Sequence, residues 1–166
     1  MESTIENDSV NPYKSPEAAV IETSNESELS PIFERFSTWA VIGLSVITLG
    51  IYALYWLYTR TERLNQHTDA PIGSAFISSA FVFYVLSLIP TLNYFMEINA
   101  TLVAVMSLAS IISPILMYVW FFKIRNRINQ LLNTAKGDES WLGPIYTFFF
   151  TIYYIQYKIN SKIDNE

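Results

Sequence analysis

Four long runs without a charged residue constrain this 166-residue chain more than any other feature. They cover residues 39–58, 72–95, 100–122 and 141–157. Twenty residues of α-helix extend ~30 Å, which matches the hydrocarbon core of a bilayer. One such run could be a buried helix of a soluble protein, but four in ~120 residues leave almost no polar face for water. Because the runs are continuous rather than alternating, β-barrel strands are excluded as well, and we predict an all-α integral membrane helical bundle with about four transmembrane helices.

The four tryptophans support this prediction, because each lies near an end of a run. They are Trp39, Trp56, Trp120 and Trp141. Indole rings favour the headgroup zone, where the ring is shielded and the N–H stays hydrated. The fourth run is short for a complete span, so a re-entrant or interfacial helix over 141–157 is the alternative.

The distribution of basic residues predicts an orientation. The loops at 60–73 and 123–140 carry six Lys and Arg residues, whereas the two terminal segments carry four. The positive-inside rule therefore places these loops in the cytoplasm and both termini outside it. If the fourth run does not cross the membrane, the C-terminus returns to the cytoplasmic side.

The N-terminal segment differs sharply from the rest of the chain. Eight of the fifteen acidic residues precede residue 35, among many Ser, Asn and Pro residues. Such a segment buries too little apolar area to offset its chain entropy. We predict a disordered acidic tail over 1–36, a transmembrane domain over 37–160 and a short C-terminal tail over 161–166. The first thirty residues contain no apolar core of a secretory signal peptide.

We find no group of residues that predicts catalysis, a cofactor or a metal. The chain has no cysteine and a single histidine, His67, which excludes disulfides and multi-histidine sites. The four runs contain no ionisable residue, although proton-coupled pumps usually need one inside the membrane. An acidic chain also gives no reason to expect nucleic-acid binding, and we predict that the protein is not an enzyme.

Small residues indicate where the helices pack. Ser107, Ser110 and Ser113 recur every three residues in the third run, and Gly50 in the first run serves either close packing or a bend of that helix. Helices in lipid associate through such small residues, so we predict that the second and third helices form the central contact. Pro114 removes a backbone hydrogen bond and predicts a kink, either a hinge or a static bend.

The segment after the third run is the best candidate for contact with lipid headgroups. Lys123, Arg125 and Arg127 follow the run directly, with an apolar stripe between them. This pattern predicts a basic amphipathic helix that continues beyond the membrane and attracts anionic headgroups. The alternative is ordinary positive-inside flanking.

Two stretches of the chain resemble each other. Residues 56–65 read WLYTRTERLN and residues 120–129 read WFFKIRNRIN, with Trp and Asn nine positions apart in both. The match suggests two copies of a two-helix hairpin. The alternative is coincidence between the ends of two membrane helices.

One stretch also resembles a known family. The order Thr48-Leu49-Gly50-Ile51-Tyr52, then Tyr55-Trp56, then Arg63-Leu64-Asn65 is similar to the start of the bacterial membrane family named domain of unknown function 4234. The resemblance is strongest over residues 39–65. It implies a bacterial origin and several membrane spans, and it brings no activity and no catalytic residues.

These observations favour a non-catalytic scaffold or accessory subunit in the bacterial inner membrane. Its expected partners are membrane lipids, together with other membrane proteins or a second copy of the chain. The alternative is a small transporter or channel for an uncharged or lipid-like solute. In that case Asn93, Gln156 and the Ser and Thr residues of the runs would line a polar path, whereas otherwise they form hydrogen bonds between helices.

Overall fold

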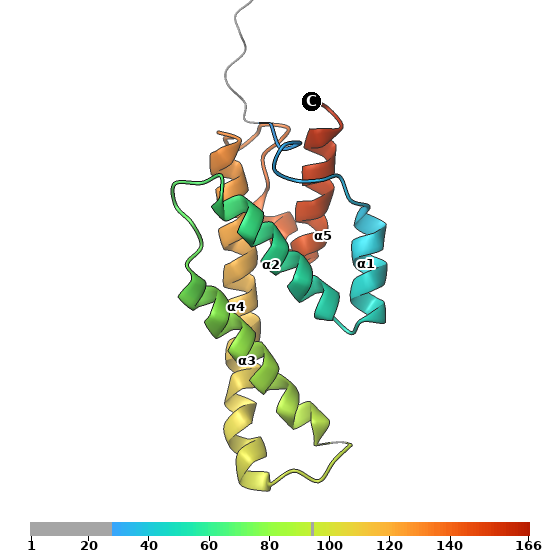
Figure 1. Cartoon of the computed structure of the whole chain (residues 1–166), viewed down its shortest axis with the longest axis vertical. Coiled ribbons are helices and arrows are strands. Elements are labelled where there is room, and N and C mark those ends of the chain that lie inside the picture. The colour runs from blue at the N-terminus through green and yellow to red at the C-terminus, as the bar shows by residue number, and fades with distance from the viewer. Residues whose placement is uncertain (1–27, 94) are drawn as a thin grey trace, which may run out of the picture.

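The computed structural model describes residues 28–93 and 95–166, which form five α-helices and no strand (Figure 1). The all-α prediction is confirmed. The helices are α1 (Thr38–Ile47), α2 (Ile51–Asn65), α3 (Ser74–Leu92), α4 (Ala100–Leu131) and α5 (Pro144–Ile163). The first 27 residues of the predicted acidic tail lie outside the described part of the chain.

Helices α3 and α4 form a long hairpin that extends beyond the rest of the molecule (Figure 1). They make the most extensive helix–helix contact among the described elements, in agreement with the predicted central pair. At the start of α4, the Asn99 side chain accepts hydrogen bonds from the N–H groups of Thr101 and Leu102. Both helices are long and apolar enough to cross a membrane, and no other described helix meets that description, so a four-span bundle is not confirmed.

The first uncharged run is two helices rather than one. Helix α1 ends at Ile47, and the chain reverses so that α2 runs back beside it (Figure 1). The reversal uses left-handed backbone at Leu49, with φ of 51°, and at Gly50, with φ of 90°. Glycine adopts this conformation without a steric penalty. The predicted single helix over 39–58 is therefore wrong, and Gly50 serves the turn rather than helix packing.

We expect the Gly50→Ala variant to lose about 1 kcal/mol of stability, because an L-residue in left-handed backbone is strained. Space is not the cause, since an added Cβ would lie 3.4 Å from Tyr84 Oη, an ordinary contact. Gly43→Ala, inside α1, is the matched control: its Cβ would meet nothing within 4 Å, and alanine favours helix. Thermal unfolding in detergent should show a lower midpoint temperature for Gly50→Ala and not for Gly43→Ala. Equal midpoints for the two variants would contradict this account of the turn.

The fourth uncharged run is also interrupted. Helix α5 contains non-helical backbone at Thr151, with φ of 45° and ψ of −125°, which divides it into two segments. The first segment carries exposed aromatic side chains, among them Phe149, which is 71% exposed. The second buries Ile152, Ile155 and Ile159 against the core. The run over 141–157 is thus a bent element and not a straight helix.

Because both interrupted runs fold back, one end of the molecule holds residues 28–36 and the C-terminus together with the basic loops (Figure 1). We call the part formed by residues 28–36, 60–73, 123–143 and 158–166 the charged end. Within it, Arg63 lies 3.6 Å from the Glu34 carboxylate, and Lys158 donates to the Glu139 carbonyl. The predicted placement of the C-terminus and of residues 28–36 opposite these loops is therefore wrong, and the C-terminus lies as the re-entrant alternative for the fourth run predicts.

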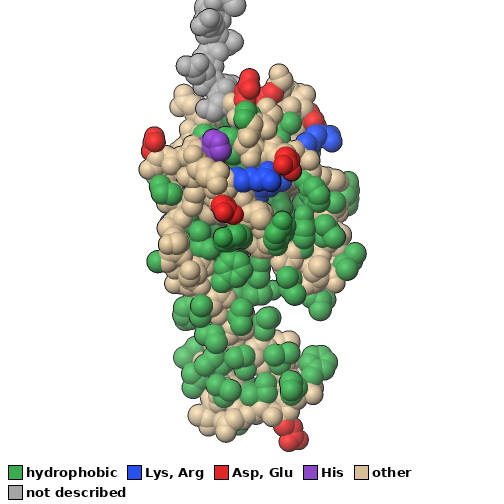
Figure 2. Space-filling model, viewed as in Figure 1, with side chains coloured by type: hydrophobic (Ala, Val, Ile, Leu, Met, Phe, Trp, Pro, Cys, Tyr) green, Lys and Arg blue, Asp and Glu red, His purple; other side chains and the backbone are tan. Residues whose placement is uncertain are grey.

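Charged side chains gather at this end, and apolar side chains cover the surface beyond it (Figure 2). Of the ten Lys and Arg residues in the chain, all except Lys14 are described, and these nine all lie in the charged end. Beyond it, Glu97 is the one charged residue among those described, in the turn between α3 and α4.

The core lies next to the charged end and includes part of the predicted tail. Leu29 and Phe33 are each 1% exposed, so the tail prediction extended too far toward α1. Trp56 and Trp120 are also buried, at 2% and 0% exposure, rather than at a lipid interface. Their indole N–H groups donate to Gln156 Oε1 and Thr61 Oγ1, each at 2.8 Å. An internal partner replaces the hydration that would hold an indole at the headgroup level.

The two resembling stretches occupy equivalent structural positions. Asn65, at the end of α2, exchanges two hydrogen bonds with the main chain of Ile72, just before α3. Asn129, near the end of α4, makes the same pair of bonds with Leu142, just before α5. Each asparagine fixes the loop that leads into the next helix. The shared arrangement supports two copies of a hairpin, α2–α3 and α4–α5.

Candidate functional site

A buried polar network joins the N-terminal segment, α2 and α5 around Gln156, which is fully buried. Its Oε1 accepts hydrogen bonds from Trp56 Nε1 at 2.8 Å and from Arg60 Nη2 at 3.1 Å. Its Nε2 donates to the Phe36 carbonyl at 3.1 Å and to Asn160 Oδ1 at 2.8 Å. Both acceptor positions and both N–H groups of the amide are used. Gln156 therefore forms hydrogen bonds between elements, as one of the two sequence-based alternatives predicts, and does not line a polar path.

Arg60 is the most buried charged residue of this network, at 7% exposure. Its guanidinium lies between two aromatic rings, 5.4 Å from the Phe33 centroid and 5.8 Å from the Trp56 centroid. Besides Gln156, it donates to the Glu34 carbonyl at 3.4 Å. No carboxylate of the described residues lies within 4.0 Å of it. A buried cation is normally paired, so this position offers an anion a favourable contact.

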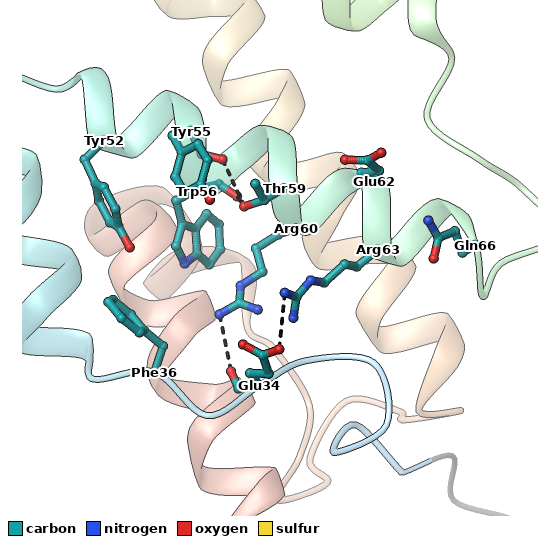
Figure 3. Close-up of a pocket in the computed structure, with 10 residues that line it drawn as sticks. All are labelled: Glu34, Phe36, Tyr52, Tyr55, Trp56, Thr59, Arg60, Glu62, Arg63 and Gln66. Carbon is teal, nitrogen blue, oxygen red and sulfur yellow. Dashed lines mark hydrogen bonds and ion pairs between the residues drawn. The ribbon is translucent and has the colours of Figure 1, made fainter.

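An open pocket of about 370 Å³ lies beside this arginine, between α2 and the N-terminal segment (Figure 3). Tyr52 and Tyr55 line the part nearer the α1–α2 turn, and Arg63 lines the part at the charged end. The lining residues recur every three or four positions along α2, which places them on one face of the helix. The spacing was visible in the sequence, but the N-terminal segment that closes the other side was predicted to be disordered.

The charges of the lining are balanced but only partly paired. Four side chains of the lining carry a formal charge: Arg60, Arg63, Glu34 and Glu62. Arg60, Arg63 and Glu34 lie together on one side of α2, whereas Glu62 points away from them (Figure 3). Arg63 pairs with Glu34 at 3.6 Å. That leaves Arg60 and Glu62 without an ion pair among the described residues. The pocket can therefore accept both an anionic and a cationic group.

Comparison with known proteins identifies the family. The family model described as domain of unknown function (DUF4234) matches residues 36–130, more than half of the chain. The chain belongs to this family. No curated protein and no solved structure matches it. The DUF4234 match covers α1 to α4 and ends before α5, so most of the pocket lining lies inside it, and Gln156 lies outside.

The basic residues predicted to contact headgroups lie on the last turns of α4 in this DUF4234 protein, and each contacts other parts of the chain. Lys123 Nζ lies 5.2 Å from the centroid of the Phe76 ring. Arg125 packs over Trp141 and donates to the Leu142 carbonyl at 2.7 Å. Arg127 donates to the Gln130 side chain. These contacts use some of the hydrogen-bond donors or faces of each cation. Binding of lipid headgroups by the three residues stays a prediction.

The predicted packing serines divide between the two faces of α4. Ser113 is buried at 4% exposure, whereas Ser107 is exposed and bonds only to its own helix, at the Val103 carbonyl. Ser110 Oγ donates to the Ser87 carbonyl of α3 at 3.3 Å. Pro114 lies within the unbroken helix α4. Ser110 therefore lies at the α3–α4 contact, and Ser113 is buried one turn further along the same helix.

Asn93 follows α3, and its side chain accepts a hydrogen bond from the Ile98 N–H at 3.1 Å. It therefore stabilises the turn between α3 and α4 and gives no support to a solute path. Within residues 28–93 and 95–166, no cluster of three His, Cys, Asp or Glu residues is arranged to hold a metal ion.

Two carboxylates near the C-terminus fasten the N-terminal segment. Asp164 accepts from Arg35 at 2.6 Å, and this hydrogen bond, together with the guanidinium charge, lowers the pKa of Asp164. Burial alone would raise the pKa of Glu166, but hydrogen bonds from the main-chain N–H groups of Leu29 and Ser30 lower it overall. These contacts hold residues 28–36 over the core.

We expect acid to release the N-terminal segment. Because folding lowers the pKa of Asp164 and of Glu166, their contribution to stability is complete above the unfolded pKa values. This contribution is lost as the pH falls below about 4 and passes through the pKa values of the two carboxyl groups in the folded protein. Hydrogen exchange, corrected for its intrinsic pH dependence, should lose protection over residues 28–36. Asp164→Asn should reduce this protection already at neutral pH, whereas Asp69→Asn, on the loop after α2, should not. Unchanged protection in Asp164→Asn would contradict the role of this contact.

Proposed function

We propose that the protein is an integral membrane protein of the bacterial inner membrane that acts as a non-catalytic scaffold or accessory subunit. In this proposal the α3–α4 hairpin crosses the bilayer. The α1–α2 hairpin and the first segment of α5 enter only the leaflet next to the charged end. The observation that carries the proposal is the separation of all described charges except Glu97 from a long apolar surface.

The lengths of the elements support this placement. Residues 100–122 of α4 are uncharged and extend ~35 Å, enough for the hydrocarbon core. Helix α1 has ten residues and extends ~15 Å, about half of that depth. Its tip carries apolar side chains in the open, including Ile47 at 79% and Leu49 at 88% exposure. Such side chains are stable in lipid and costly in water.

The basic residues support an orientation opposite to that predicted for the termini. All nine described Lys and Arg residues lie in the charged end, and none lies in the described residues beyond it. Short segments rich in Lys and Arg remain in the cytoplasm. We therefore place the charged end, with residues 28–36 and the C-terminus, on the cytoplasmic side.

A scaffold fits the contacts better than a transporter does. The buried network fixes the charged end as one unit, and Asn93 and Gln156 are engaged in structural hydrogen bonds. A fixed cytoplasmic surface on a membrane anchor is suited to holding a partner or a second copy.

Affinity purification of the full chain in mild detergent tests the scaffold role. We expect co-purification of a membrane partner, or of a second copy, at fixed stoichiometry by native mass spectrometry. Recovery as a monomer without a partner would contradict the scaffold. Retention in membranes after an alkaline wash tests the membrane placement separately, and release into the supernatant would contradict it.

A further inference from the structure

We propose that the pocket on α2 binds the headgroup of a zwitterionic aminophospholipid, with its phosphate at Arg60 and Arg63 and its ammonium at the carboxylate of Glu34. The inference rests on the membrane placement proposed above. It names a lipid of the cytoplasmic leaflet as the ligand, and it places binding on α2, away from the basic residues at the end of α4.

The gradient of polarity along the pocket matches that of a phospholipid. Tyr52 and Tyr55 line it close to the apolar α1–α2 tip, and Arg60, Arg63 and Gln66 follow toward the charged end (Figure 3). Tyr55 is 60% exposed and offers an aromatic surface beside which the glycerol and upper acyl chains can pack. With the tip in lipid, the arginines lie at the level of the phosphates.

The state of the charges favours a phosphate at Arg60. This guanidinium is largely buried and bonds to two neutral acceptors, the Glu34 carbonyl and Gln156 Oε1. Guanidinium groups bind phosphate oxygens through several N–H donors at once, and such charge-assisted bonds are among the strongest. Arg63 reaches the same pocket from the next turn of α2.

The same balance favours a zwitterion over a purely anionic headgroup. The two arginines are matched by Glu34 and Glu62 in the lining, so a ligand with a net negative charge would meet repulsion after its first contact. An ethanolamine headgroup carries one negative phosphate and one ammonium group. Its ammonium has N–H donors for carboxylates, which a quaternary choline group lacks.

Lipid titration of the full chain in mild detergent, followed by native mass spectrometry, tests the inference. The probes are phosphatidylethanolamine, phosphatidylcholine, phosphatidylglycerol and diacylglycerol with identical acyl chains. We expect one molecule of phosphatidylethanolamine to bind about tenfold more tightly than diacylglycerol, which lacks the phosphate, and more tightly than the other two phospholipids. Glycerophosphoethanolamine, which has no acyl chains, should compete weakly.

Two variants that each remove one positive charge distinguish binding in the pocket from general electrostatic attraction of the lipid to the protein. Arg63→Gln should weaken binding of phosphatidylethanolamine about tenfold, and its side chain is exposed enough for the fold to tolerate the change. Lys136→Gln, at an exposed position outside the pocket lining, should leave binding unchanged. Thr59→Trp, which fills the pocket with a bulky side chain, should also reduce binding.

Three results would overturn the inference. They are equal binding of diacylglycerol, preferred binding of phosphatidylglycerol, and equal losses in Arg63→Gln and Lys136→Gln. Strong competition by glycerophosphoethanolamine would replace the lipid with a soluble phosphate ligand and would likewise overturn it. If the alkaline wash retains the protein in membranes while these lipid results fail, the inference alone is wrong. Release by the wash would remove the membrane placement as well.

Discussion

Replacing Gln156 with leucine is expected to lower the free energy of unfolding by about 4 kcal/mol, because it leaves buried polar groups without partners. The side chain forms four hydrogen bonds, which join Trp56 and Arg60 of α2 to Phe36 and Asn160. Leucine can form none of them. The Arg60 cation would keep only the Glu34 carbonyl as its acceptor. Chemical unfolding in detergent, followed by tryptophan fluorescence, measures the loss.

Two further variants test whether the loss in Gln156→Leu comes from its hydrogen bonds. Gln156→Glu keeps an acceptor for Trp56 and Arg60 but loses the donors to Phe36 and Asn160, so it should be destabilised less than leucine. Gln130→Leu makes the same change at an exposed position of α4, where the cost should stay below ~0.5 kcal/mol. Equal losses in Gln156→Leu and Gln130→Leu would show that the network does not stabilise the fold.

The second large effect is expected for Ser113→Leu, which should destabilise the α3–α4 hairpin by about 3 kcal/mol. Ser113 is 4% exposed on α4, so a larger side chain has no free space and must separate the helices. Ser107→Leu is the matched control, because Ser107 is exposed on the same helix. Its leucine would meet solvent or lipid at little cost.

Chemical cross-linking measures directly whether α3 and α4 have moved apart. Cysteines at positions 87 and 110 lie on facing parts of α3 and α4, as the Ser110–Ser87 hydrogen bond places them. A short bifunctional reagent should join them in the parent chain and in the Ser107→Leu background. In the Ser113→Leu background the yield should fall several-fold. An unchanged yield there would mean that Ser113 is not part of the helix contact.

The apolar character of the chain was predictable from its sequence, but its path was not. Residues 72–95 and 100–122 read as spans and correspond to α3 and the apolar part of α4. The run at 39–58 reads the same way, because hydropathy reports composition and not backbone direction. Only Gly50 marks the reversal, and a glycine inside a membrane helix is common enough to be read as a packing residue or a bend within one helix.

The site depends on contacts that sequence spacing does not reveal. Gln156 lies 100 positions from Trp56 and 96 from Arg60, and nothing local connects them. The paired roles of Asn65 and Asn129 were suggested by the repeat, but the loops that they fix differ in length, so their partners Ile72 and Leu142 do not align. Leu29 and Phe33 were assigned to a disordered tail because polar neighbours outnumber them.

The most direct test of the membrane placement uses the absence of cysteine from the chain. Single cysteines replace three exposed residues: Asp69 on the loop after α2, Glu97 in the turn between α3 and α4, and Asn165 near the C-terminus. A membrane-impermeant maleimide applied to intact spheroplasts should label only the cysteine at position 97. The same reagent applied to inverted vesicles should label those at positions 69 and 165. Labelling of position 165 from outside, with position 69 reached only from inside, would contradict the two-span account.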